Sequence, residues 1–242
     1  MTFSAPLIVG HRGAPRRARE NTLAAFGLAR EEGADGVELD VHRTVDGALV
    51  VYHDAEIEGF GVLAQHEIAA IQTVFPWMPT LDTVLDDCHG MLVNIEIKNS
   101  PPDADFDPEE ALAIAVVDLL HARRDSADNI LVSSFHLPSI ERVRTIDPAI
   151  PTGYLTGIRV APVDALEAAI LGGHRAVHPF FGLLADQNAV TVIDAAHTVG
   201  IKVNTWTVND PAEILRLATA GVDAIITDIP AEARAALAGG RI

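Results

Sequence analysis

The sequence is short of cysteine and of positive charge, and each shortage excludes a class of structure or partner. Cys88 is the single cysteine among 242 residues, so the chain has no intramolecular disulfide. Lysine and arginine number 17 against 34 aspartate and glutamate residues, which gives a formal net charge of −17. Because such a surface repels a phosphate backbone, nucleic acid is not expected as a partner.

The chain also lacks long apolar runs. No uninterrupted apolar stretch approaches the length of a membrane-spanning helix, so stable membrane insertion is not expected. Residues 1–10 carry no basic segment, and their apolar run meets His11 and Arg12 at once, which predicts a first strand rather than a signal peptide. We therefore expect a reducing, cytoplasmic setting, in which Cys88 is a buried and unreactive thiol within a helix.

Apolar residues are plentiful, and they recur in a strand-then-helix order along the whole chain. Hydrophobic residues make up 49% of the sequence, enough for one large α/β core. Short apolar runs predict eight strands, at 7–9, 37–41, 91–97, 129–133, 152–155, 175–178, 201–208 and 223–227. Helical periodicity and capping residues predict a helix after each strand, at 23–32, 81–88, 109–123, 138–144, 164–171, 189–199, 211–220 and 231–237.

Eight strand–helix units in a chain of this length are typical of a (β/α)₈ TIM barrel. A doubly wound open sheet that binds a dinucleotide would need Gly-x-Gly-x-x-Gly after its first strand, where this chain has His11-Arg12-Gly13. We therefore expect a single TIM-barrel domain over 1–242, with a short insertion at about 55–78.

The stretch 36–54 carries the most informative pattern. Glu38 and Asp40 alternate with apolar residues, so both carboxylates should lie on one face of a strand. Asp46-Gly47 predicts a turn, after which a return strand leads to His53. Two close carboxylates repel each other unless a cation or a proton lies between them.

In a TIM barrel the chemistry lies at the carboxyl ends of the strands. Glu96 ends the third predicted strand, so it should join Glu38 and Asp40 there. Three inward acids are costly unless they are paired or bind metal, which predicts a site for a hard divalent cation. The same rim should collect the polar and aromatic side chains of His11, Arg12, His53, Asn94, Lys98, Ser133, Ser134, Phe135, His178, Asn204, Trp206 and Asp228.

Other residues have simpler interpretations. Trp206 could cover the barrel mouth, and Asp228 could cap the last loop. His42 is expected to point away from the ligand face or to lie outside the site. Six histidines are expected to be surface or capping residues: His42, His66, His89, His121, His174 and His197.

With these motifs in place, the chain resembles the glycerophosphodiester phosphodiesterases. The resemblance covers nearly the whole length, and the matching pieces occur in the family's order. They are His11-Arg12-Gly13, Glu20-Asn21-Thr22, Ala25-Phe26, Gly33-Ala34-Asp35, Glu38-Leu39-Asp40-Val41, Thr44, Asp46-Gly47, His53-Asp54, Pro79-Thr80-Leu81, Glu96-Ile97-Lys98, Ser134-Phe135, Trp206-Thr207-Val208-Asn209, Gly221-Val222-Asp223 and Thr227-Asp228.

The resemblance implies hydrolysis of small-molecule glycerophosphodiesters to glycerol 3-phosphate and an alcohol. It also implies one divalent cation, Mg²⁺ or Ca²⁺, and leaves the oligomeric state open. The roles that it implies are metal binding by Glu38, Asp40 and Glu96, acid–base catalysis by His11 and His53, phosphoryl binding by Arg12 and Lys98, and substrate binding by Phe135 and Trp206.

The insertion at 55–78 is shorter than the family's usual one, so the alcohol head group is left undefined. One alternative is a lysophospholipase D or sphingomyelinase D on the same barrel, although those secreted relatives typically have disulfides and a signal segment. A metal-dependent amidohydrolase would need His-x-His on the first strand. A non-catalytic phosphate-binding barrel should have lost a histidine or an acid, and all are present.

Overall fold

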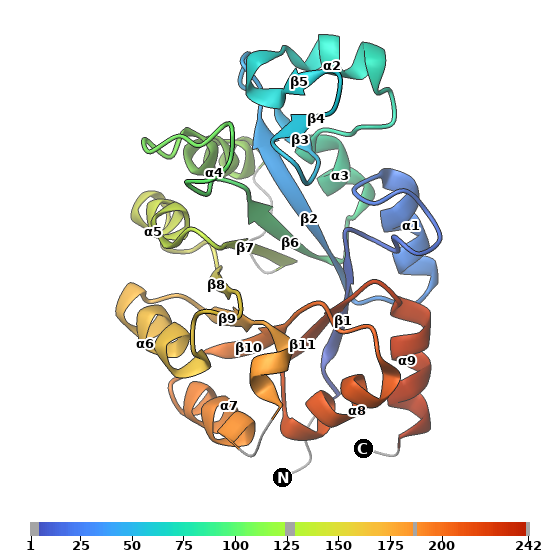
Figure 1. The fold of residues 1–242 in the computed structure, drawn as a ribbon, viewed down its shortest axis with the longest axis vertical. Helices are drawn as coiled ribbons and strands as arrows, with labels where there is room; N and C mark the ends of the chain where they lie inside the picture. Colours follow the sequence, from blue (N-terminus) through green and yellow to red (C-terminus); the bar gives the residue numbers. More distant parts are fainter. Residues whose placement is uncertain (1–4, 124–128, 186–187, 241–242) are drawn as a thin grey trace.

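Eight parallel strands close into a barrel in the computed structural model, which describes residues 5–123, 129–185 and 188–240 (Figure 1). Neighbouring strands follow one another in chain order, and pairing of Val9 with Gly36 joins the first to the second and completes the closure. The predicted (β/α)₈ fold is therefore confirmed. Its strands are β1 (Leu7–His11), β2 (Gly36–Arg43), β6 (Leu92–Ile97), β7 (Ile130–Ser134), β8 (Thr152–Thr156), β9 (Ala176–Pro179), β10 (Lys202–Thr205) and β11 (Ala224–Thr227).

Helices surround the barrel, and several begin where the sequence places a capping residue. The side chains of Thr22, Thr80 and Asp210 accept hydrogen bonds from the first turns of α1, α3 and α8. Within the described ranges, no helix is long and apolar enough to span a bilayer. The barrel helices are α1 (Leu23–Glu31), α3 (Leu81–Asp87), α4 (Ala111–Arg123), α5 (Leu137–Ile146), α6 (Pro162–Gly172), α7 (Asn188–Thr198), α8 (Pro211–Ala220) and α9 (Pro230–Gly239), with a 3₁₀ turn η3 (Phe181–Leu184) before α7.

The apolar core lies mainly between the strands and the helices. Val37, Leu39 and Val41 of β2 belong to this outer core and are fully buried. Because side chains alternate along a strand, the acids between them point into the barrel. Cys88 is also buried in this outer core, and burial raises the pKa of its thiol to about 12, as expected for an unreactive cysteine.

The insertion after β2 is a small module with a core of its own. Strand β3 (Leu49–Val51) pairs antiparallel with β2, and the module projects from one side of the barrel (Figure 1). Buried side chains of Val50, Leu63, Ile71 and Met78 hold it together. Its other elements are β4 (Glu56–Ile57), β5 (Gly61–Val62), η1 (Leu63–Gln65) and α2 (Ile68–Val74).

Two of the histidines expected at the surface are buried instead. His174 is 3% exposed, and its Nδ1 lies 2.8 Å from the Thr152 hydroxyl. Burial, with a smaller effect of nearby Arg144, lowers its pKa to about 4. His42 is also fully buried. Both predictions failed because hydrogen-bond partners, one for His174 and two for His42, allow an imidazole to be buried, and the sequence does not reveal those partners.

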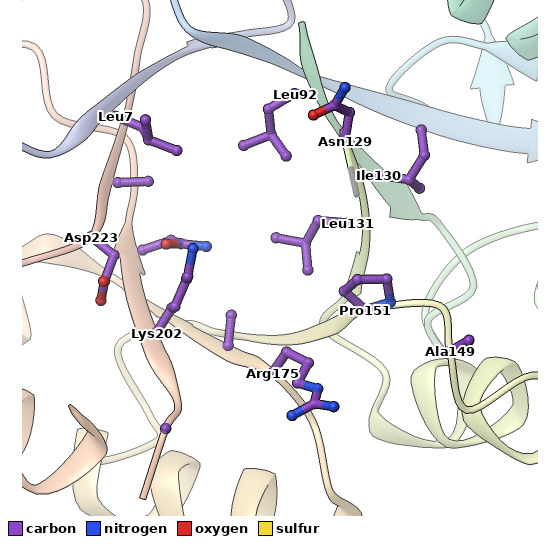
Figure 2. Close-up of a pocket in the computed structure, with 14 residues that line it drawn as sticks. Leu7, Leu92, Asn129, Ile130, Leu131, Ala149, Pro151, Arg175, Lys202 and Asp223 are labelled. Atoms are coloured by element: carbon purple, nitrogen blue, oxygen red, sulfur yellow. The ribbon is translucent and has the colours of Figure 1, made fainter. Parts of the chain in front are cut away.

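A cavity of about 470 Å³ lies at the end of the barrel where the strands begin. Figure 2 shows leucines on one side of this cavity and the longer side chains of Arg175 and Lys202 on the other. None of the residues predicted to bind metal or substrate, or to catalyse, lines it. Chemistry at this end is therefore not indicated, and the site belongs at the opposite mouth.

Gly36 marks a position where β2 and β6 approach too closely for a side chain. A Cβ there would lie 2.6 Å from the Leu92 carbonyl oxygen. We expect Gly36→Ala to lower the free energy of unfolding by about 1–3 kcal/mol, as overpacking does. Gly27 in α1 has open space around it, so Gly27→Ala should be neutral or stabilising. Urea denaturation of both variants tests this, and equal stability of Gly36→Ala and wild type would contradict it.

His178 predicts an acid-sensitive stability. Burial lowers its pKa to about 3 in the folded protein, against about 6.5 when unfolded. As pH falls from 6.5 towards 3, the unfolded chain takes up a proton that the folded state does not, so stability falls by up to about 1.4 kcal/mol per pH unit. Denaturation at several pH values should show a shallower decline in His178→Asn. Parallel curves for variant and wild type would refute this.

Candidate active site

The turn after β1 brings Arg12 over the ends of the neighbouring strands. Arg12 has φ of 54° and Gly13 has φ of 90°, and a Cβ on Gly13 would lie 2.6 Å from the Ala25 backbone. Only glycine fits this left-handed, crowded position. The turn lets the Arg12 N–H donate to Glu38 Oε2 at 3.0 Å and places Arg12 Nε 3.2 Å from Asp40 Oδ2.

Three buried acids converge at the mouth. Asp40 on β2 is the register neighbour of Glu96 on β6, and carboxylate oxygens of Glu38, Asp40 and Glu96 lie within 4.8 Å of one another. Glu38 Oε1 is buried and has no hydrogen-bond partner among the described residues. Carboxylate oxygens in this number are a donor set for Mg²⁺ or Ca²⁺, so the residues fit a hard divalent cation.

Two basic side chains and one amide also reach this acidic cluster, which we define as Glu38, Asp40 and Glu96. Lys98 Nζ lies 3.1 Å from Glu96 Oε1 and 3.6 Å from Asp40 Oδ1. Asn21 Nδ2 donates to Asp40 Oδ2 at 2.8 Å. With Arg12 and Lys98 charged, the cluster still has one negative charge in excess if all three acids are ionised.

The carboxyl groups titrate differently because their neighbours differ. Burial raises the pKa of Glu38 to about 8, and the nearby Asp40 carboxylate adds to the effect. Burial also opposes ionisation of Asp40, but Lys98 and Arg12 outweigh it and hold its pKa below the ordinary value. Burial raises the pKa of Glu96 despite Lys98. The ionised form of Glu38 is thus the least stabilised of the three by neighbouring positive groups, so a bound cation would lower the pKa of Glu38 most.

His11 ends β1 beside the cluster and is held by a carboxylate. Its Nδ1 lies 2.7 Å from Asp228 Oδ1, and Asn209 Nδ2 donates to Asp228 Oδ2 at 2.6 Å. Burial alone would lower the pKa of His11, but the bond to Asp228 and the charge of Glu38 raise it overall. Asp228 therefore does more than cap the last loop, because it orients this imidazole and favours its protonated form.

His53 lies where the chain leaves β3 for the insertion. Its Nδ1 is 2.6 Å from Asp54 Oδ1, and its side chain is 34% exposed. In His11 and His53 alike, Nδ1 meets a carboxylate, whereas Nε2 makes no hydrogen bond within the described part of the chain. Two imidazoles of this kind suit proton transfer to or from a bound molecule.

Aromatic rings form another wall of the mouth. Phe135, directly after β7, meets Trp206, directly after β10, edge to face with centroids 5.2 Å apart. Phe180 packs on the other side of Trp206 at 5.8 Å, a contact that the sequence pattern did not reveal. Trp206 Nε1 donates to the His178 carbonyl at 2.8 Å, so His178 supports the wall with its backbone while its ring stays buried.

The structure thus brings the predicted acids and their two cations into direct contact at one rim, with His11 beside them as the register neighbour of Glu38. The sequence left the supporting residues without a role, although several occur in the motifs that it displays. Asn21 belongs to the Glu20-Asn21-Thr22 motif, and at its φ of 55° the side-chain amide donates to Asp40. The supporting residues are Glu20, Asn21, Asp54, Asn209 and Asp228.

Comparison with known proteins identifies the family. The model of the glycerophosphoryl diester phosphodiesterase family matches residues 11–232. A glycerophosphodiester phosphodiesterase from Caldanaerobacter subterraneus subsp. tengcongensis is 31% identical over 244 residues, covering 93% of this chain and 94% of the relative.

Solved structures give the same result. A glycerophosphodiester phosphodiesterase from Thermotoga maritima superposes with a TM-score of 0.80 and 27% identity, covering 94% of this chain and 96% of the other. An Oleispira antarctica phosphodiesterase, solved with the product sn-glycerol-3-phosphate, gives a TM-score of 0.83 at 26% identity, covering 97% and 98%. These matches show that the chain is an enzyme of the glycerophosphoryl diester phosphodiesterase family.

Proposed function

We propose that this mouth hydrolyses glycerophosphodiesters to glycerol 3-phosphate and an alcohol, with one divalent cation and two histidines. The observation that carries the proposal is the meeting of the three-acid cluster and the carboxylate-held His11 at the carboxyl ends of β1, β2 and β6. The family match and the product bound to the Oleispira antarctica relative support the substrate class.

Glu38, Asp40 and Glu96 would hold the cation through oxygen. The unpartnered, buried Glu38 Oε1 supports this assignment, because a buried carboxylate oxygen otherwise goes unsatisfied. When bound, the cation would polarise the phosphoryl group and offset its negative charge. Whether Mg²⁺ or Ca²⁺ serves is a matter of ligand number and cavity size.

Arg12 and Lys98 would bind the phosphoryl oxygens. Both already lie against the acids, at 3.2 and 3.1 Å, so each can turn part of its hydrogen-bonding capacity to a substrate anion. With all three acids ionised, as metal ligands must be, the acidic cluster and these two cations together have one excess negative charge. A divalent cation changes that to one positive charge, which matches the single negative charge of a phosphodiester. Phe135 and Trp206 would line the organic part of the pocket.

His11 and His53 would move the protons. Cleavage forms one P–O bond to the attacking hydroxyl and breaks the P–O bond to the leaving alcohol. Neutral His53 would accept the proton of the attacking hydroxyl, whether that belongs to water or to the glycerol. His11, whose protonated form Asp228 stabilises, would donate a proton to the leaving oxygen. An alcohol and a phosphomonoester result once water has supplied the final oxygen.

The substrate and the metal can be tested together. Purified protein should release glycerol 3-phosphate from glycerophosphocholine, and excess EDTA should abolish the reaction until Mg²⁺ or Ca²⁺ is restored. Without any substrate, the cation should raise the melting temperature of wild type, because it binds only the folded state, and not that of Glu38→Gln or Glu96→Gln.

Three results would count against this proposal. Full activity after exhaustive chelation would remove the metal from the reaction. An equal rise of melting temperature in Glu38→Gln and wild type would place the cation elsewhere. Turnover of lysophosphatidylcholine in preference to glycerophosphocholine would favour the lysophospholipase D alternative over the proposed substrate.

Removal of either proposed catalytic imidazole should strongly reduce kcat. His11→Ala and His53→Ala should each lower kcat by roughly 10²–10⁴-fold, the usual contribution of a general acid or base. Asp228→Asn should act more subtly. Because Asp228 raises the pKa of His11, its neutralisation should lower that pKa, so a smaller fraction of His11 is protonated at high pH.

The alkaline limb of the pH–rate profile should therefore move to lower pH in Asp228→Asn, with less change in the acid limb. His121→Asn is a matched control, because His121 also bonds a carboxylate, that of Asp147, but its half-exposed side chain lies in the last turn of α4. Near-wild-type kcat in His11→Ala or His53→Ala at saturating metal and substrate would overturn the proposed pair. An unshifted alkaline limb would overturn the role of Asp228.

A further inference from the structure

His42 lies on the same side of β2 as the acids. Side chains alternate along a strand, and Val41 faces the outer core, so His42 shares the face of Glu38 and Asp40. Its register partner across β3 is Val50, which packs in the core of the insertion. The expectation that His42 points away from the ligand face is therefore wrong, although His42 is not a member of the acidic cluster.

The His42 ring joins two segments that are distant in sequence. Its Nε2 lies 3.1 Å from the His53 carbonyl oxygen, and its Nδ1 lies 2.6 Å from Asp105 Oδ2. The side chains of His42 and Asp105 are 1% and 4% exposed. A backbone carbonyl can only accept, so Nε2 carries a hydrogen and donates it to His53. Asp105 at Nδ1 fixes the plane of the ring.

This contact holds the His53 backbone itself, one residue after Tyr52, whose N–H donates to the Asp40 carbonyl at 3.1 Å. Among the described residues, no other hydrogen bond reaches the N–H or C=O of His53. Its side chain is 34% exposed, and its one partner there, Asp54, is 65% exposed. His53 also precedes an insertion that packs around its own core. An imidazole at such a junction would share the motion of the insertion unless something tied it to the barrel.

Asp105, which bonds His42, belongs to a well-connected loop. It lies in the loop between β6 and α4, which begins directly after Lys98. Buried Asn99 closes this loop, because its Oδ1 accepts from the Asp107 N–H at 2.8 Å and its Nδ2 donates to Glu110 Oε2 at 2.9 Å. The end of β2 therefore carries His42, which bonds His53, and the loop after β6 carries Asp105, which bonds His42.

We propose that His42 is a positioning residue, which fixes the main chain of His53 to the barrel and so sets the distance from its imidazole to the acidic cluster. The inference rests on the proposed role of His53 as a proton acceptor. A misplacement of about 1 Å can cost roughly 100-fold in rate, so loss of this one hydrogen bond should lower kcat while substrate binding at Arg12 and Lys98 continues.

Two conservative variants separate the two bonds of the ring. The amide of His42→Gln reaches about as far as Nε2 and can still donate to the His53 carbonyl. The amide of His42→Asn reaches only about as far as Nδ1, so it keeps a donor for Asp105 and loses the one for His53. We expect His42→Asn to lower kcat roughly 10- to 100-fold with KM within about twofold, and His42→Gln to recover most of that loss.

A double-mutant cycle with His53→Ala distinguishes positioning from general damage. If His42 acts through His53, His42→Asn should lower the residual kcat of His53→Ala by less than about twofold, because coupled residues are not additive. His174→Ala is the control, since it also removes a buried histidine with one hydrogen bond and should lower stability without changing kcat. If His42→Asn does not fold, Asp105→Ala is used in its place. This variant keeps the His42 ring but removes the carboxylate that orients it, and the same result is expected.

The outcomes are distinct. Wild-type kcat in His42→Asn, failure of His42→Gln to recover activity, or full multiplication of the His42→Asn and His53→Ala effects would overturn the positioning role alone. Near-wild-type kcat in His53→Ala would overturn the proposed function of that histidine and, with it, the reason for a positioning residue.

Discussion

The mutual repulsion of Glu38, Asp40 and Glu96 in a buried mouth is the constraint on which the rest of the site depends. Pairing of β2 with β6 forces the three carboxylates to within 4.8 Å of one another, and burial removes the water that would screen them. Arg12 and Lys98 form ion pairs with these carboxylates, and Asn21 donates a hydrogen bond to Asp40, so each offsets part of the negative charge. The proposed divalent cation would offset the remainder, and it would let a chain of net charge −17 attract an anionic ester.

The two imidazoles are supported in different ways that follow from their places in the fold. His11 belongs to a barrel strand, and Asp228 from the last strand–helix turn holds it across the closure of the barrel. His53 lies outside the strands, at the base of the insertion, so its position depends on contacts that cross between segments. His11 is therefore held within the barrel, whereas the His53 backbone is held by His42 on β2, which in turn bonds Asp105 in the loop after β6.

The fold and the positions of the acids were predictable from the sequence, because alternation and the strand–helix repeat are local patterns. Glu38 and Asp40 face the barrel because their neighbours Val37, Leu39 and Val41 require the apolar side. The supporting contacts were not predictable in the same way. Asp228 meets His11 across 217 positions of sequence, and Asp105 meets His42 across 63. His42 was expected to point away from the ligand face or to lie outside the site; the period of two that placed Asp40 puts it on the same face, but outside the acidic cluster.

Diffraction from crystals soaked in Mn²⁺, a hard divalent cation with an anomalous signal, tests the central claim most directly. The account predicts one strong anomalous peak in contact with carboxylate oxygens of Glu38, Asp40 and Glu96, at about 2.0–2.6 Å as for other hard cations. The Lys98 ammonium should be displaced from at least one of its carboxylate partners. A mouth without a peak, or a peak ligated by other residues while Lys98 keeps both acids, would contradict the account.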